Sequence, residues 1–212
     1  SAQLIEGETT KKENKLLDWI MTIISISFAL FLFIFLPLFV TSTIFKDIIN
    51  MPVYFNIISG GFRLIIFISY LVAISQLKDV KRLFQYHGAE HKVVYNFESG
   101  KELSTSNAKQ FSTKHPRCGT SFVFIIMLVT IFTYAILDSI ALLFINELTY
   151  TYRMIFHILC LPLVSGIGYE VLKFLSLKQN NLICKTLSQP GLWLQHITTK
   201  EPSKNQLEVS IF

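Results

Sequence analysis

The sequence predicts an all-α membrane protein with about four transmembrane helices. Hydrophobic residues make up 51% of the 212-residue chain, phenylalanine occupies 19 positions, and only 16% of the residues are charged. Soluble domains are less apolar than this. A helix of about 20 residues crosses the bilayer core of about 30 Å, and four apolar runs reach that length: 16–45, 53–77, 120–145 and 154–175.

The first apolar run is longer than the apolar core of a signal peptide, and no small-residue cleavage site follows it. We therefore expect it to remain as the first span. It and the second run form a helix pair within 16–77, and the last two runs form a second pair within 120–175. Three segments are predicted outside the membrane: 1–15, a helical segment at 78–119, and a tail at 176–212.

Lysine and arginine are concentrated in the three segments outside the spans, whereas the two short connections at the opposite face hold only Lys46 and Arg153. By the positive-inside rule, both termini and the central segment face the cytoplasm or stroma. Besides the lipid bilayer, this basic face suits anionic lipid, or a membrane or ribosomal component. The sequence contains no base-reading motif, so sequence-specific nucleic-acid binding is not predicted. Oligomeric state is not indicated.

The central segment begins with the stretch "FQYHGAEHKVVYNFESG". Apolar residues and the two histidines recur there at spacings of three and four, which predicts that the helix of the second span continues to Phe97. Gly100 is the expected stop, because glycine takes the left-handed conformation without strain. His87 and His91 then lie one turn apart, where both imidazoles can reach one ion. With Glu90 they form H-x-x-E-H, in which two histidines hold zinc and the glutamate is the general base.

A second polar cluster, "STKHPRCGTSF", places His115 and Cys118 on a turn ahead of a helix, with Pro116 restricting the loop. We predict that these two residues join the two histidines of the first cluster on one ion at the inner membrane surface. A thiolate with imidazoles suits zinc best, with another divalent transition metal as the alternative. Arg117 is expected to lower the pKa of the thiol or to hold an anionic group. The competing interpretation is that the histidines pack on a half-buried helix face and the second cluster is a connecting loop.

Ionisable residues inside spans are costly and often functional. Asp138, near the outer boundary, is expected to pair with Arg153 or His157 in a structural role, and Arg63 lies deeper. Glu170, about one turn from the inner end of the fourth span, is predicted as a further metal ligand or as a partner of the ligands. The alternative for Glu170 is a side chain that extends to the membrane interface.

The tail contains a short apolar patch around Trp193 that is predicted to lie on the inner membrane surface. Ser203 and Gln206 predict a capping box at the start of a short, interfacial C-terminal helix. His196 is interpreted as an exposed surface histidine, with an approach to the metal cluster as the alternative.

The motifs "FQYHGAEHK", "STKHPRCGTSF", "GIGYE" and "PGLWLQHITTKEPSKNQLEVSI" resemble those of the YqhQ-like family of multi-pass membrane proteins. The resemblance runs from about the first span to the end of the chain. That family is a domain of unknown function, occurs in bacteria and plastid-bearing organisms, and carries the label of a predicted metal-dependent enzyme. The resemblance implies a multi-pass protein of the bacterial inner membrane or of a plastid membrane, with a metal site built from these His, Glu and Cys residues.

Two functions remain open from the sequence. The first is a metal-dependent hydrolase, with Glu90 as general base, which requires an open coordination position. The second is a non-catalytic scaffold or membrane-protein assembly factor held together by the ion, which follows if all four predicted ligands close the coordination shell. Transport is a weaker third reading, since Arg63 and Asp138 alone do not define a pathway.

Overall fold

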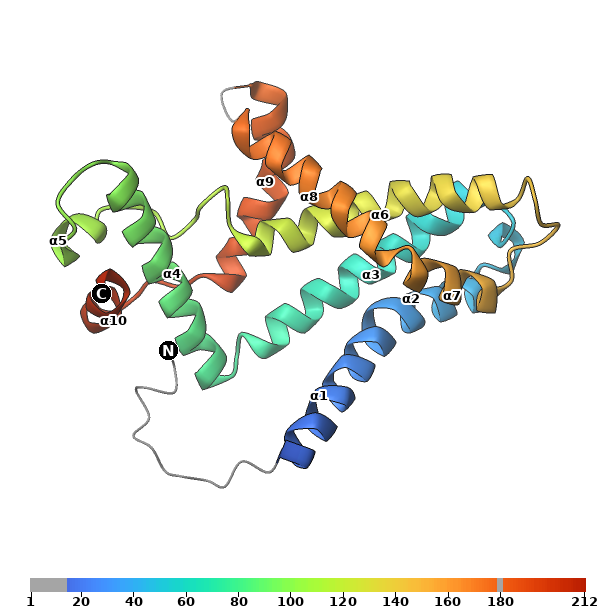
Figure 1. The fold of residues 1–212 in the computed structure, drawn as a ribbon, viewed down its shortest axis with the longest axis horizontal. Helices are drawn as coiled ribbons and strands as arrows, with labels where there is room; N and C mark the ends of the chain where they lie inside the picture. The colour runs from blue at the N-terminus through green and yellow to red at the C-terminus, as the bar shows by residue number, and fades with distance from the viewer. Residues whose placement is uncertain (1–14, 179–180) are drawn as a thin grey trace.

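The computed structural model describes residues 15–178 and 181–212. Every regular element of this part of the chain is a helix (Figure 1), which confirms the all-α prediction. The expected N-terminal segment, 1–15, lies outside the described residues except for Lys15.

Three of the predicted spans are single long helices. The first is continuous over Lys15–Ile44 and consists of α1 (Lys15–Leu30), a π-helical turn (Phe31–Phe35) and α2 (Leu36–Ile44). A short 3-10 turn (Lys46–Ile48) leads to α3 (Pro52–Ile74), and the third is α6 (Gly119–Ala141). Each is long and apolar enough to cross a membrane.

The predicted fourth span is divided in two, unlike the single helix expected at 154–175. It comprises α7 (Tyr150–Leu159) and α8 (Leu161–Leu177), which are bent by 56° relative to each other. Pro162 lies in the first turn of α8, where a proline is tolerated because the N–H it lacks would have no helical partner. The described residues therefore contain three helices suited to spanning, or four if this bent pair is one span.

The helix that carries the histidines is also separate from the second span, although the sequence predicted a continuous helix. Leu77 is extended, with φ −71° and ψ 135°, and α4 (Lys78–Glu98) starts after it in a new direction (Figure 1). The charged residues begin at this bend, and Asp79 in the first turn of α4 favours a helix N-terminus there. The predicted stop is confirmed, since Gly100 has a φ of +69°.

The remaining helices are α5 (Thr105–Ala108), α9 (Leu182–Thr198) and α10 (Lys204–Ile211). α4, α5 and α10 share a small apolar core of Ala89, Ala108 and Leu207. The predicted capping box of Ser203 and Gln206 is present at the start of α10. The tail patch predicted for the membrane surface is divided between two faces of α9, because Leu194 is fully buried in the protein and Trp193 is exposed.

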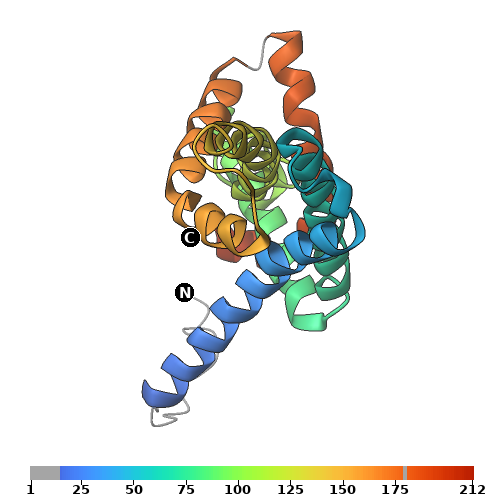
Figure 2. The same cartoon turned by 90° about the vertical axis from the view of Figure 1, so that its right-hand side faces the viewer.

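α6 is the central helix, packed by α3, α8 and α9 (Figure 2). A glycine on each of these three helices allows close contact with α6. A Cβ at Gly60 of α3 would overlap the side chain of Ile131, one at Gly168 of α8 would overlap Ile126, and one at Gly191 of α9 would overlap Ser121. Such small residues at helix contacts are typical of packing in membranes, where apolar burial alone does not drive association. α8 and α9 also pack on α6, so the positions of both helices depend on that helix.

Asp138 of α6 is the centre of a fully buried polar group near one end of the bundle. It accepts hydrogen bonds from Arg153 Nε at 3.0 Å, from His157 Nε2 at 3.1 Å and from Asn56 Nδ2 at 2.9 Å. The Arg153 guanidinium also lies 3.6 Å from the centre of the Phe55 ring. Asp138 thus pairs with both residues that the sequence offered as alternatives, and it connects α3, α6 and α7.

The Asp138 group predicts a large loss of stability on removal of its cation. Arg153→Met leaves a buried carboxylate without its charged partner, so we expect a loss of about 3–5 kcal/mol. Thermal unfolding of the purified protein in detergent measures it. The matched control is Lys204→Ala, which removes an exposed ion pair with Glu208 and should change stability by less than about 1 kcal/mol. Equal unfolding temperatures for the two variants would contradict the prediction.

Candidate metal centre

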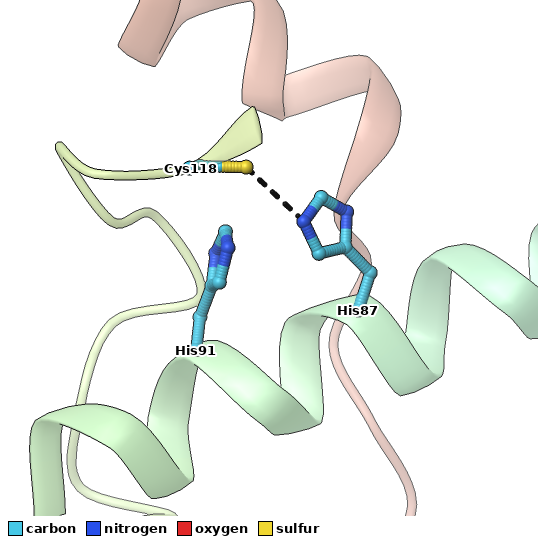
Figure 3. Close-up of side chains that lie close together, drawn as sticks. All are labelled: His87, His91 and Cys118. Atoms are coloured by element: carbon cyan, nitrogen blue, oxygen red, sulfur yellow. Dashed lines mark hydrogen bonds between the residues drawn. The ribbon is translucent and has the colours of Figure 1, made fainter. Parts of the chain in front are cut away.

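Two histidines of α4 point from the same face of the helix toward the start of α6 (Figure 3). The ring centres of His87 and His91 are 4.4 Å apart, as expected for residues one helical turn apart. His91 is buried and His87 is half-buried. The predicted pair therefore occupies the inner face of α4.

Cys118 lies opposite the histidines, at the residue that caps the N-terminus of α6. Its Sγ is 3.2 Å from His87 Nε2 and 3.1 Å from Thr120 Oγ1, and it accepts the Thr120 N–H at 3.4 Å. One ligand atom from each of His87, His91 and Cys118 lies within 4.8 Å of the other two. A tetrahedral zinc site requires separations of about 3.3–3.6 Å between such atoms, so small side-chain movements suffice.

Backbone carbonyls set the orientation of both imidazoles. His87 Nδ1 donates to the Thr198 carbonyl oxygen at 2.9 Å, and His91 Nδ1 donates to the Thr113 carbonyl oxygen at 2.5 Å. A carbonyl oxygen only accepts, so each Nδ1 carries a proton and Nε2 is the ring nitrogen left for the site. Histidines that bind metals characteristically donate their second ring N–H in this way.

The two carbonyl-bearing segments are themselves tied to α4. Lys200 N–H donates to the Phe84 carbonyl at 2.9 Å, and a Cβ at Gly88 would overlap the Lys200 carbonyl oxygen. The Lys92 ammonium is buried, donates to the Lys109 and Phe111 carbonyl oxygens and pairs with Glu201. Sequence reasoning missed Lys92, whose only signal was its place directly after His91.

Gln195 of α9 fixes the turn that presents Cys118. Its side chain is fully buried, accepts the His115 N–H at 2.7 Å and donates to the His115 carbonyl and to Ser121 Oγ, both at 2.8 Å. Both backbone polar groups of His115 are thereby satisfied by one side chain. No motif in the sequence indicates this role of Gln195, whose only signal was its place directly before His196.

The electrostatics of the cluster favour a thiolate. Burial by itself raises the pKa of the Cys118 thiol, but interactions with His87, His91 and Thr120 outweigh it and lower the pKa to about 5. The hydrogen bond to Cys118 raises the pKa of His87, against the effect of burial. In the metal-free protein at neutral pH Cys118 is therefore a thiolate. A thiolate is the form of cysteine that binds metals, so this residue is prepared for an ion.

His115, the fourth predicted ligand, is not in the group that can share one ion. Its ring centre is 5.8 Å from that of His91, its Nδ1 accepts the Arg117 N–H at 3.2 Å, and its Nε2 lies 3.5 Å from a Glu98 carboxylate oxygen. That Nε2 is buried and makes no hydrogen bond with the described residues. Burial lowers the pKa of His115, although Glu98 opposes the shift. The tight turn from His115 to Cys118 directs the two side chains differently.

The other predicted site residues also lie outside the group. Glu90 is exposed on α4, and Arg117 pairs with Glu98 rather than with Cys118. Glu170 is exposed on α8, where it lines an apolar groove with Gly166 and Phe174.

The position of Glu170 has a geometric cause. Gly168 faces α6, and Glu170, two residues later and about 200° around the helix, points away from the bundle. His196 is an exposed histidine that bonds to the Trp193 carbonyl and Lys114, which confirms the first interpretation given for it.

The described fold and site define an all-helical protein with three or four helices suited to a membrane and a His–His–Cys cluster at the start of one of them. A family model described as "Protein of unknown function (DUF1385)" matches residues 1–212, and the chain belongs to this family. It is 33% identical over 214 residues to "Uncharacterized protein YqhQ" of Bacillus subtilis (strain 168), a match over 97% of this chain. The resemblance to the YqhQ-like family is therefore confirmed.

The chain spans 64% of the length of that Bacillus relative. No solved structure matches the chain. Membership of this family does not define a reaction, because function depends on the residues of the site.

The lowered pKa of Cys118 predicts an unusual pH dependence of thiol alkylation in the metal-free protein. With Cys160 and Cys184 replaced by serine, the rate with iodoacetamide should rise through pH 5, the approximate pKa, and level off above it, because the thiolate is the reactive form. In His87→Ala the rise should move toward the ordinary thiol pKa of about 8.5. Identical pH profiles for the parent and His87→Ala would contradict this origin of the shift.

Proposed function

We propose that the protein is an integral membrane enzyme that binds one zinc ion through His87, His91 and Cys118 and uses it for hydrolysis. One observation carries the proposal: both histidines place Nδ1 on backbone carbonyl oxygens and leave Nε2 for a site that includes a buried thiol. Histidines that merely fill a core have no need of this shared orientation. The mixed nitrogen and sulfur donors favour zinc, with another divalent transition metal as the alternative.

The number of protein ligands favours catalysis over a structural role. Catalytic zinc sites have three protein ligands and an open position, whereas structural sites have four. When bound in this way, zinc supplies Lewis acidity and activation of water. Thr198 and Thr113 would hold the imidazoles in the binding tautomer through their carbonyl oxygens. Glu90, exposed beside His91 and close enough for its charge to act on His87, is our candidate for the base that accepts a proton.

The distribution of lysine and arginine supports a location of this site at the cytoplasmic or stromal face, with both termini on the same side. A bacterial inner membrane or a plastid membrane is the proposed location. The basic segments around the site would contact anionic lipid, or a membrane or ribosomal component.

A second candidate function is a metal-stabilised scaffold or membrane-protein assembly factor. It is favoured by the buried Nε2 of His115, which has no hydrogen bond with the described residues and belongs to a ring 5.8 Å from His91. Rotation of this ring would add a fourth ligand and close the shell, as in structural zinc sites. The ion would then join α4, α6 and the turn between them without catalysis.

Elemental analysis of the purified protein tests metal binding directly. We expect near one zinc per chain in the parent and in Glu90→Gln, whose side chain lies outside the cluster. His91→Ala and Cys118→Ser should lose most of the metal, because loss of one ligand weakens binding by more than about a hundredfold. His196→Ala, an exposed histidine, is the matched control and should keep its zinc. Undiminished zinc in both His91→Ala and Cys118→Ser would overturn the site.

His115→Ala distinguishes the enzyme from the scaffold. If the shell has three protein ligands, the variant should retain zinc and its cobalt derivative should keep the parent's absorption spectrum. If His115 completes the shell, zinc content falls and the cobalt spectrum changes. The first result supports an open, catalytic site, and the second supports the structural role.

A further inference from the structure

A second chemically distinct region lies among the apolar helices, away from the metal cluster. A cavity of about 350 Å³ is lined by residues of α1, α3, α6, the π-helical turn and the α7–α8 bend, most of them apolar. Arg63, near the middle of α3, forms part of its wall together with Tyr134 and His157. An arginine at this depth suggests a function, because a charge in hydrocarbon is costly and is usually paired.

The charges around the cavity do not cancel. Arg153 and Asp138 form a buried ion pair of one positive and one negative charge, whose sum is zero. Within residues 15–178 and 181–212, no carboxylate forms an ion pair with Arg63. One positive charge is therefore left on the cavity wall, in surroundings of low polarity where an unpaired ion is expensive.

Arg63 also has hydrogen-bonding capacity to spare. Its Nε donates to the carbonyl oxygen of Phe33, in the π-helical turn, at 2.9 Å, and its Nη1 lies 3.4 Å from Thr130 Oγ1. A guanidinium has five N–H donors, so three have no acceptor among the described residues. These two contacts fix the head of Arg63 at the cavity and leave part of it for a ligand.

A second polar atom at the same cavity is unused. His157 is 1% exposed and lines the cavity, and its Nδ1 is buried without a hydrogen-bond partner in the described part of the chain. Its Nε2 is already bonded to Asp138. A buried polar atom without a partner is costly, so a ligand group at this end of the cavity would satisfy both His157 and Arg63.

We propose that this cavity binds a single-chain amphiphile whose hydrocarbon chain lies along the apolar wall and whose anionic group, a carboxylate or a phosphate, pairs with Arg63. The charge of Arg63 selects an anion, and the apolar lining selects the chain. The volume lies at the small end of the range for ligand pockets, which favours one chain over a two-chain lipid. α1 provides the entry side, because Ile26 and Leu30 line the cavity and are exposed outside it.

Photolabelling of the purified protein tests the proposal. The probe is hexadecanoate with a diazirine in its chain, and mass spectrometry should place the label on cavity residues such as Leu30 and Met127. Unlabelled hexadecanoate and hexadecyl phosphate are the anionic competitors, and hexadecanol is the neutral one. Hexadecanol should compete at least about tenfold less well than the better anion, because it lacks the charge that pairs with Arg63. The stronger of the two anions identifies the carboxylate or the phosphate as the natural group.

Three variants test separately the contributions of the Arg63 charge and of the cavity volume to ligand binding. Arg63→Leu should reduce labelling by at least about tenfold, whereas Arg63→Lys should retain most of it, because it keeps the charge. Ala29→Phe keeps Arg63 but fills the cavity that Ala29 lines, so it should also reduce labelling, and it tests the proposal even if Arg63→Leu does not fold. The control is Ile65→Phe, at an exposed position of α3 outside the lining. Full labelling of Arg63→Leu or Ala29→Phe, or equal competition by hexadecanol, would overturn the proposal.

Discussion

The hydrogen bond from His87 Nδ1 to the Thr198 carbonyl oxygen is the contact on which the site depends. It joins α4 to the end of α9, and α9 in turn holds the turn before α6 through Gln195. The orientation of His87 and the position of Cys118 are therefore both set by the same helix. α9 supplies no candidate ligand, yet it orients His87 and holds the turn that presents Cys118. The C-terminal third of the chain therefore positions a site whose candidate ligand atoms all come from the middle of the chain.

Two polar regions lie among the apolar helices, one around Asp138 and one around Arg63, and they differ in how far their hydrogen bonds are satisfied within the protein. Hydrocarbon offers no hydrogen bonds, so polar groups there must find partners within the protein. The Asp138 carboxylate satisfies this rule, with Arg153, His157 and Asn56 as donors, and a carboxylate held in this way is suited to fixing helix positions. Arg63 satisfies it only in part. A partly satisfied charge beside a cavity differs from a structural ion pair because its remaining partner has to come from outside the chain.

The sequence predicted the structural features that depend on neighbouring residues. It did not predict those that depend on contacts between residues far apart in the chain. Long apolar runs, the facing of His87 and His91, and the stop at Gly100 are local, and the structure contains them. The outward direction of Glu170 follows from how α8 packs on α6, which no local pattern encodes. Gln195 and His115 are 80 residues apart in the chain, and the bond between them is made to backbone atoms that every residue has. The prediction of His115 as a ligand rests on its spacing from Cys118, which fits a ligand pair as well as a turn, and the structure places its ring 5.8 Å from that of His91.

The exposure of the cluster bears on the choice between an open and a closed site. His91 and Cys118 are buried, His87 is half-buried, and Glu90 on the next part of the helix is exposed. His115 lies beyond His91, with its Nε2 3.5 Å from a Glu98 carboxylate oxygen, and Glu98 pairs with Arg117. For the proposed zinc ion, a fourth ligand from His115 requires its ring to rotate away from Glu98 toward the cluster. A site with three protein ligands requires only small side-chain movements within the group of His87, His91 and Cys118. The open site therefore requires less rearrangement of the residues present.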